Sequence, residues 1–164
     1  METNFTIPNY ILASKTTRFL NFIIDILIMK LMMWILIIIT DLIFSEYKLG
    51  LINQVDSFDK METYLFWSIT SFFYYTITET FLSRSLAKYF TKTIVVLKDG
   101  SKPKSIDILA RSALRQIPFE YFTFFQGRKP GWHDEYSNTF VVKKDKLEQI
   151  LIDYKELFEI EKQK

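Results

Sequence analysis

The stretch that decides the fold reads Arg18-Phe-Leu-Asn-Phe-Ile-Ile-Asp25-Ile-Leu-Ile-Met-Lys30-Leu-Met-Met-Trp-Ile-Leu-Ile-Ile-Ile-Thr40. Its apolar part runs for 22 residues from Phe19 to Thr40 and contains two charges, Asp25 and Lys30. A helix needs about 20 such residues to cross the hydrocarbon core of a bilayer. The stretch is apolar on all sides, unlike the single apolar stripe of a surface helix. It therefore predicts a first membrane span at about residues 19–40.

A second apolar block from Thr63 to Leu82 predicts a second span at about residues 63–82. It is less apolar than the first, with Ser71, Tyr75 and Thr78 on one side, and hydroxyl groups of this kind can bind a neighbouring helix. Glu79 lies near its end. Two adjacent spans indicate a transmembrane hairpin.

The charges that flank the spans predict the orientation. The loop at 41–62 holds two basic residues against five acids, whereas 83–105 holds six basic residues against Asp99 alone. Basic loops remain on the cytoplasmic side. We therefore expect cytoplasmic N- and C-termini in a bacterial inner (cytoplasmic) membrane.

The second half of the chain predicts mostly helix. The run Thr93–Leu97 suggests extended chain at the cytoplasmic surface. Residues of about 105–126 mix apolar side chains with Arg111, Arg115 and Pro118, which favours an interfacial or re-entrant helix over a third span. Residues 143–164 have helical periodicity with six Lys and six acids, typical of a cytoplasmic amphipathic helix that packs on the chain or docks to a partner.

Composition excludes several classes of site. The chain of 164 residues has no Cys and one His, so it can form neither a disulfide nor a multi-histidine metal site by itself. We expect no cofactor and no bound metal. The N-terminus starts polar, and its first apolar block is too long for a signal peptide.

The charged residues of the first span need partners. Arg18 and Asp25 are seven residues apart and share a helix face, and Asn21 on the same side could bridge them. Lys30 lies deeper and points elsewhere. Charged groups at this depth indicate either a cation or proton pathway or an ion-pair latch that fixes the register of the helices, and we favour the latch.

The third polar group is Gly131-Trp132-His133-Asp134. A His–Asp pair could perform acid–base chemistry, but no nucleophile accompanies it, so we predict no enzyme. We interpret the group as a polar turn with Trp132 at the membrane interface. Asp134 could pair with Arg18, Arg111 or Arg115.

Together these residues resemble the RDD family of small bacterial membrane proteins, named for one arginine and two aspartates. Arg18 matches the arginine, and Asp25 and Asp134 match the aspartates. Glu79 matches an acid that often precedes a Gly-Lys pair, here Ala87-Lys88. Arg111 and Arg115 match the arginines of the following helix. The Trp132-His133-Asp134 form resembles members from Bacteroidota, and the likeness spans about Lys15 to Val142.

These observations predict an all-α integral membrane protein. It would have an RDD-like membrane domain at 1–142, followed by the cytoplasmic helix at 143–164. The resemblance implies a transport-related role in cation or proton handling, with Arg18, Asp25, Glu79, Arg111, Arg115, His133 and Asp134 as candidate residues. Because two spans cannot enclose a path, we expect a homo-oligomer or other membrane subunits as partners besides the lipid bilayer, and no nucleic acid. The alternative is a non-enzymatic accessory subunit of a larger membrane complex, with Lys30 as a contact to its partner.

Overall fold

The computed structural model describes residues 5–44, 51–117 and 132–162. Its helices are the short 3-10 turn η1 (Asn9–Ile11), α1 (Lys15–Ile43), α2 (Leu51–Asp56), α3 (Lys60–Leu82), α4 (Leu86–Phe90), α5 (Ser105–Leu114), α6 (Trp132–Tyr136) and α7 (Lys144–Lys162). Its strands are β1 (Thr93–Leu97) and β2 (Thr139–Lys143). Most of the described chain is therefore helical, as the sequence predicts.

Helix α1 contains the first predicted span and continues beyond it. It has 29 residues and begins at the cap residue Ser14, whose side chain accepts a hydrogen bond from the Thr17 amide at 3.1 Å. Among the described helices, it is the one long and apolar enough to cross a membrane. Its outer surface carries large exposed side chains such as Leu27, Leu31 and Trp34. This surface has the character of one that meets lipid or another protein.

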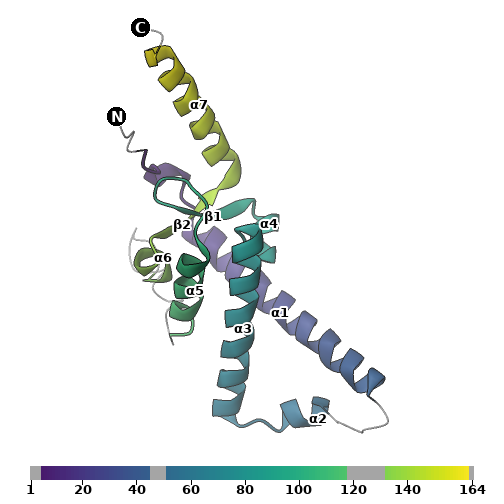
Figure 1. The fold of residues 1–164 in the computed structure, drawn as a ribbon. Coiled ribbons are helices and arrows are strands. Elements are labelled where there is room, and N and C mark those ends of the chain that lie inside the picture. Colours follow the sequence, from purple (N-terminus) through teal and green to yellow (C-terminus); the bar gives the residue numbers. More distant parts are fainter. Residues whose placement is uncertain (1–4, 45–50, 118–131, 163–164) are drawn as a thin grey trace.

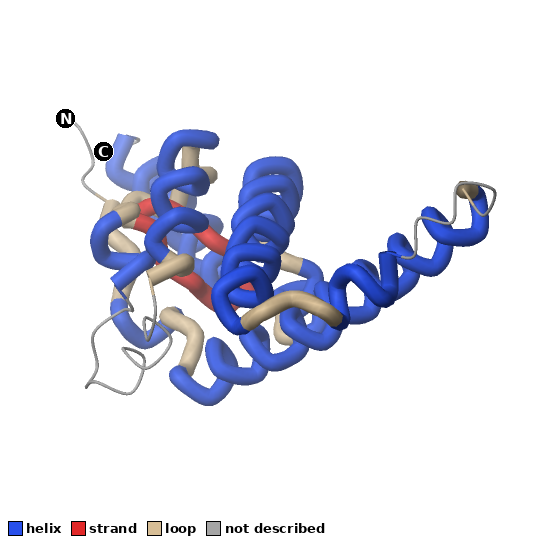
Figure 2. Tube along the Cα trace, turned by 90° about the horizontal axis from the view of Figure 1, so that it is seen from below, coloured by secondary structure: helices blue, strands red, loops and turns tan. Residues whose placement is uncertain are grey.

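Helix α3 covers the second predicted span. Its 23 residues begin with a capping box between Asp59 and Glu62 and end at Ser83, which has a left-handed backbone conformation. Figure 1 shows α1 and α3 diverging from the strand end of the molecule toward the end where α2 lies between them. Figure 2 shows the second half of α1 extending away from α3, while α2 lies against its end, where the Leu51 amide donates to Asp41 at 3.2 Å. The two helices form a splayed hairpin.

The prediction of an all-α fold needs one correction, because β1 and β2 pair as an antiparallel sheet. Thr93 lies opposite Lys143 and Leu97 lies opposite Thr139. Leu12 adds an isolated bridge to Val142, and the Ala13 amide donates to the Val141 carbonyl at 2.8 Å. The run at 93–97 is thus a paired strand, not surface chain, and the sheet ties the start of α1 to the end of the membrane domain.

The sheet supports a small apolar core between the two termini. Ile11, Val96, Val142 and Leu147 are buried there, with residues of α7 packed against them. The tail helix begins at Lys144, because Lys143 belongs to β2. Helix α5 covers the first part of the helix expected at 105–126, and residues 118–126 of that prediction lie outside the described ranges.

Candidate functional site

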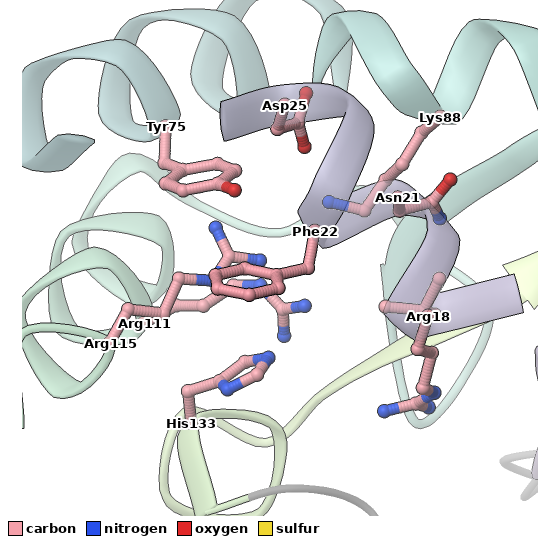
Figure 3. A pocket seen from close by; sticks show the side chains of 10 residues that line it. Arg18, Asn21, Phe22, Asp25, Tyr75, Lys88, Arg111, Arg115 and His133 are labelled. Carbon is pink, nitrogen blue, oxygen red and sulfur yellow. The ribbon is translucent and has the colours of Figure 1, made fainter. Parts of the chain in front are cut away.

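A group of charged side chains is buried where the first turns of α1 meet α3, α4, α5 and α6 (Figure 3). We name these seven residues the charge cluster: Arg18, Asp25, Glu79, Lys88, Arg111, Arg115 and Asp134. Each exposes 9% or less of its surface. Charges this deeply buried must be paired or hydrogen-bonded, so their partners define what the site can do.

Asp134 is the carboxylate that connects α6 to α1 and α5. Arg18 donates to one of its oxygens through Nη1, and Arg111 donates to the other through Nη1. His133 Nε2 lies 3.4 Å from Oδ1 of the same carboxylate. Burial alone would raise the pKa of Asp134, but the charges of Arg111 and Arg18 outweigh it and hold the pKa well below its usual range. Asp134 is therefore a permanent anion at ordinary pH.

Glu79 gathers three cations at the end of α3. It accepts from Lys88 Nζ at 2.6 Å, from Arg115 Nη2 at 3.0 Å and from Arg111 Nε at 3.0 Å. Arg111 consequently spans two carboxylates, Glu79 and Asp134, and it also donates to Thr139 Oγ1 at 2.6 Å. The planar guanidinium suits such a bridge, because its donors point in fixed directions.

Asp25 is held differently from the other two carboxylates. It accepts hydrogen bonds from Tyr74 Oη at 2.6 Å, Ser85 Oγ at 2.6 Å and the Ala87 amide at 3.0 Å. All three donors are neutral. Within the described ranges, Asp25 forms no ion pair, although it is 99% buried. It is thus the acid of the cluster whose charge depends least on a neighbouring cation.

Lys88 links Asp25 to the ion pairs. Its Nζ lies 3.5 Å from Ser85 Oγ, the hydroxyl that donates to Asp25, and 2.6 Å from Glu79. Burial lowers the pKa of Lys88 more than the negative charge of Glu79 raises it, with Arg115 and Arg111 lowering it further. A buried lysine of this kind gives up a proton more readily than a surface lysine.

A cavity of about 30 Å³ lies inside the cluster, lined by Arg18, Asp25, Lys88, Arg111, Arg115 and His133 among others. That volume holds a water molecule or a small ion but no organic solute. The cluster contains four basic side chains and three carboxylates. Among the described residues, Arg111 Nη2 is a buried donor with no hydrogen-bond partner. Both facts make the cavity attractive to water and unfavourable to a metal cation.

The structure brings together all but one of the residues selected from the sequence. Arg18, Asp25, Glu79, Arg111, Arg115, His133 and Asp134 meet in or beside the cluster, and Lys30 lies elsewhere. Two expectations need correction. Asn21 does not bridge Arg18 and Asp25, because its amide contacts Thr93 at 3.2 Å and Thr91 at 2.6 Å. His133 and Asp134 lie buried on the short helix α6 and not on a turn, and Asp134 pairs with Arg18 and Arg111, two of the three arginines expected as its partners.

Several functional residues escaped the sequence analysis. Tyr74, Ser85 and Lys88 contact Asp25 or Glu79 directly, and Thr139 contacts Arg111. Lys88 was matched as part of the Ala87-Lys88 pair but was not selected as a site residue, and its distance of nine residues from Glu79 across a helix end was the available signal. Nothing in the sequence distinguishes Ser85 from the other serines near it.

This is the structure of a helical membrane protein. It has two splayed helices, an apolar surface on α1 and a cluster of buried charges near one end. The chain matches the RDD family over residues 12–138, which include Arg18, Asp25 and Asp134. It belongs to the RDD family. No curated protein and no solved structure shows significant similarity to it.

Proposed function

We propose that this protein is a small proton-coupled transport protein of the inner membrane, in which Asp25 gains and loses the coupling proton. The observation that carries the proposal is the environment of Asp25, a buried carboxylate held by Tyr74, Ser85 and the Ala87 amide. Protonatable groups inside membrane helices characterise proton relays. Because the three groups that donate to Asp25 are neutral, protonating its carboxylate does not deprive a buried cation of its counter-charge.

The other two carboxylates are less suited to this role. A proton on Asp134 or Glu79 would leave the arginines bound to it without their counter-charge, and breaking a buried pair in this way costs about 3–5 kcal/mol. Their ion pairs instead support the latch inferred from the sequence, which holds α1, α3, α5 and α6 together. The cluster thus divides into a fixed latch and one exchangeable acid.

A short proton route leads away from Asp25. Ser85 Oγ donates to Asp25 and lies next to Lys88 Nζ, so a proton could pass between the acid and the amine through one hydroxyl. The lowered pKa of Lys88 favours such a transfer. In a cation/proton exchanger, the route from Asp25 through Ser85 to Lys88 would carry the proton. The transported metal cation would not enter the small cavity of the charge cluster, because basic groups outnumber carboxylates there.

The proposal places α3 in the bilayer as a second span, antiparallel to α1, with the charge cluster in the cytoplasmic half. Two splayed helices do not enclose a path for a cation. A second copy would complete it through the apolar surface of α1, where Leu27, Leu31 and Trp34 expose about half or more of their area. The transport unit is therefore an oligomer.

Proton flux tests the role of Asp25. The protein is reconstituted in liposomes loaded with a pH-sensitive dye, and flux is started by gradients of Na⁺, K⁺ or Li⁺. We expect Asp25→Asn to reduce flux at least about tenfold, because an amide cannot carry the proton. Asp153→Asn, on the exposed side of α7, should retain the wild-type rate. Equal flux in the Asp25→Asn protein, with unchanged thermal unfolding, would contradict the proposal.

A second candidate is an accessory subunit of a larger membrane complex. The projecting second half of α1 favours it, because Leu42 and Ile43 expose 74% and 67% of their area. Purification from native membranes in mild detergent, followed by mass spectrometry, separates the two candidates. A stoichiometric foreign subunit supports the accessory role, whereas a homomer supports transport.

A further inference from the structure

A second hollow lies between α1 and α3 and adjoins the small cavity of the charge cluster, with which it shares Phe22, Tyr75 and Arg115. This Lys30 groove has a volume of about 360 Å³ and is lined by Ile26, Met29, Lys30, Trp67, Ser71 and Arg115, among others. Its size falls within the range of pockets that bind small organic molecules. Aliphatic and aromatic side chains form most of its wall, and two basic groups face it.

Lys30 is the unusual member of this groove. It follows Arg18 by 12 residues, so the helical rise places it about 18 Å further along α1. With Arg18 at the cytoplasmic edge, Lys30 lies near the middle of a hydrocarbon core about 30 Å thick. The side chain is exposed to the groove, and a cation at this depth is costly unless it is paired or hydrated.

Within the part of the chain that the structure describes, no acidic side chain forms an ion pair with Lys30. No carboxylate lines the groove, and Lys30 has no ion pair there. The two acids inside α1 and α3, Asp25 and Glu79, are already held by other donors. A second copy of the chain would bring the same two acids, which already accept hydrogen bonds from other side chains. Asp41 lies near the C-terminal end of α1, and Glu62 lies in the first turn of α3. Among the described residues, the groove therefore presents Lys30 without an anion.

We propose that the Lys30 groove binds a single-chain amphiphile with a carboxylate head, of the fatty-acid type. The carboxylate pairs with Lys30, and the hydrocarbon chain lies against Ile26, Met29 and Trp67. A bilayer phospholipid does not fit, because its phosphate stays at the surface, about 15 Å from mid-membrane. The inference does not depend on Asp25 carrying protons. It assigns an organic-acid ligand to Lys30, which is not a member of the charge cluster.

Trp67 provides a direct test, because bromine atoms on a bound chain quench its fluorescence. The protein is placed in phosphatidylcholine vesicles, and dibromostearic acid is compared with its methyl ester. The quenching of Trp67 is obtained as the difference between the wild type and the Trp67→Phe protein, which keeps the other two tryptophans. We expect the acid to act at concentrations at least about tenfold below those of the ester, since a hydrogen bond to a charged group contributes about 1.5–3 kcal/mol.

Variants at Lys30 decide whether the charge is responsible. Lys30→Gln should abolish the preference for the acid, and Lys30→Arg should preserve it. Lys60→Gln, an exposed lysine at the start of α3, is the matched control and should behave as the wild type. Equal quenching by acid and ester, or an unchanged preference in Lys30→Gln, would overturn the proposal.

Two further results would also overturn it. Brominated phosphatidylglycerol that quenches as strongly as the acid would assign the groove to a membrane lipid. A copurifying polypeptide that is lost from Lys30→Gln would assign Lys30 to an acidic subunit. Proton flux is measured separately, so failure of this proposal leaves that of Asp25 untouched, and the reverse also holds.

Discussion

Arg111 is the residue that unites the two halves of the ion-pair network. It is fully buried, and its Nε binds Glu79 while its Nη1 binds Asp134 and Thr139. A lysine has the same charge but a single donor atom, so it cannot reach both carboxylates. The joint between α3, α5 and α6 therefore depends on the guanidinium shape, not on charge alone.

Arg111→Lys should lower the free energy of unfolding by about 1.5–3 kcal/mol, because one buried carboxylate loses the hydrogen bond from Arg111 while it keeps its other cations. Thermal unfolding in detergent, followed by circular dichroism, measures the change. Arg84→Lys is the control, since Arg84 stacks over the Tyr89 ring and has no ion pair in the described part of the chain. Equal effects of the two substitutions would show that Arg111 does not act as a bridge.

Asp134 predicts how stability responds to acid. Its pKa is lowered in the folded protein, so its stabilising effect is complete above the ordinary aspartate pKa of about 3.9 and is lost as the pH falls toward the lower, folded value. Unfolding midpoints between pH 6 and pH 3 should fall most steeply below about pH 4. Asp134→Asn should be less stable at pH 6 and show a shallower decline. A decline as steep as that of the wild type would assign the acid sensitivity to other carboxylates.

Most of the individual residues of the charge cluster could be predicted from the sequence, and the residues that were missed or misplaced have physical reasons. Arg18, Asp25 and Asp134 stand out because charges in or beside an apolar span are costly. Asn21 was placed wrongly because helix geometry alone does not reveal that Thr91 and Thr93 pack beside it. Lys88 and Ser85 join the site through the turn after α3, which only the folded chain shows.

At the scale of elements, the long helices α1 and α3 and the tail helix follow from apolar runs and periodicity, whereas the sheet does not. A strand of five residues has too short a pattern to predict its partner, and β1 and β2 are separated by more than 40 residues. Their pairing also brings Leu12 and Ala13 alongside Val141 and Val142. The sheet thereby sets where α1 begins relative to α6.

The end of α3 offers a test of local backbone strain. Ser83 ends this helix with φ of 56°, a conformation that glycine adopts at no steric cost. Ser83→Gly should therefore raise the free energy of unfolding by about 0.5–1 kcal/mol. Ser105→Gly at the start of α5 should have the opposite sign or no effect, because its backbone is helical. A loss of stability in Ser83→Gly would show that the serine side chain matters more than the turn.

At the scale of the whole molecule, the sheet, α4 and α7 lie toward one end, and α2 lies toward the other (Figure 1). This segregation matches the distribution of basic residues in the sequence, which the positive-inside rule assigns to the cytoplasm. The cytoplasmic location of the termini stays a prediction from the loop charges.

Single cysteines can measure the orientation, since the chain has none of its own. Ser57→Cys, after α2, should react with a membrane-impermeant maleimide in intact spheroplasts. Ser101→Cys, after β1, should react only when the membrane is opened. Both positions are exposed in the structure, so a difference reports sidedness and not burial. Equal labelling in intact spheroplasts would mean that α3 does not return the chain across the bilayer.

The ion pair between Arg18 and Asp134 joins residues that are 116 positions apart. Because a chain is synthesised from its N-terminus, α1 leaves the ribosome well before its counter-charge exists. The apolar run after Arg18 must therefore carry the first helix into the membrane unaided, with Arg18 and Asp25 still in contact with water or with the insertion machinery. The ion pairs of Asp134 can form only when α6 has been made, so a nascent chain that stops short of Asp134 would display Arg18 without its carboxylate to cellular quality control.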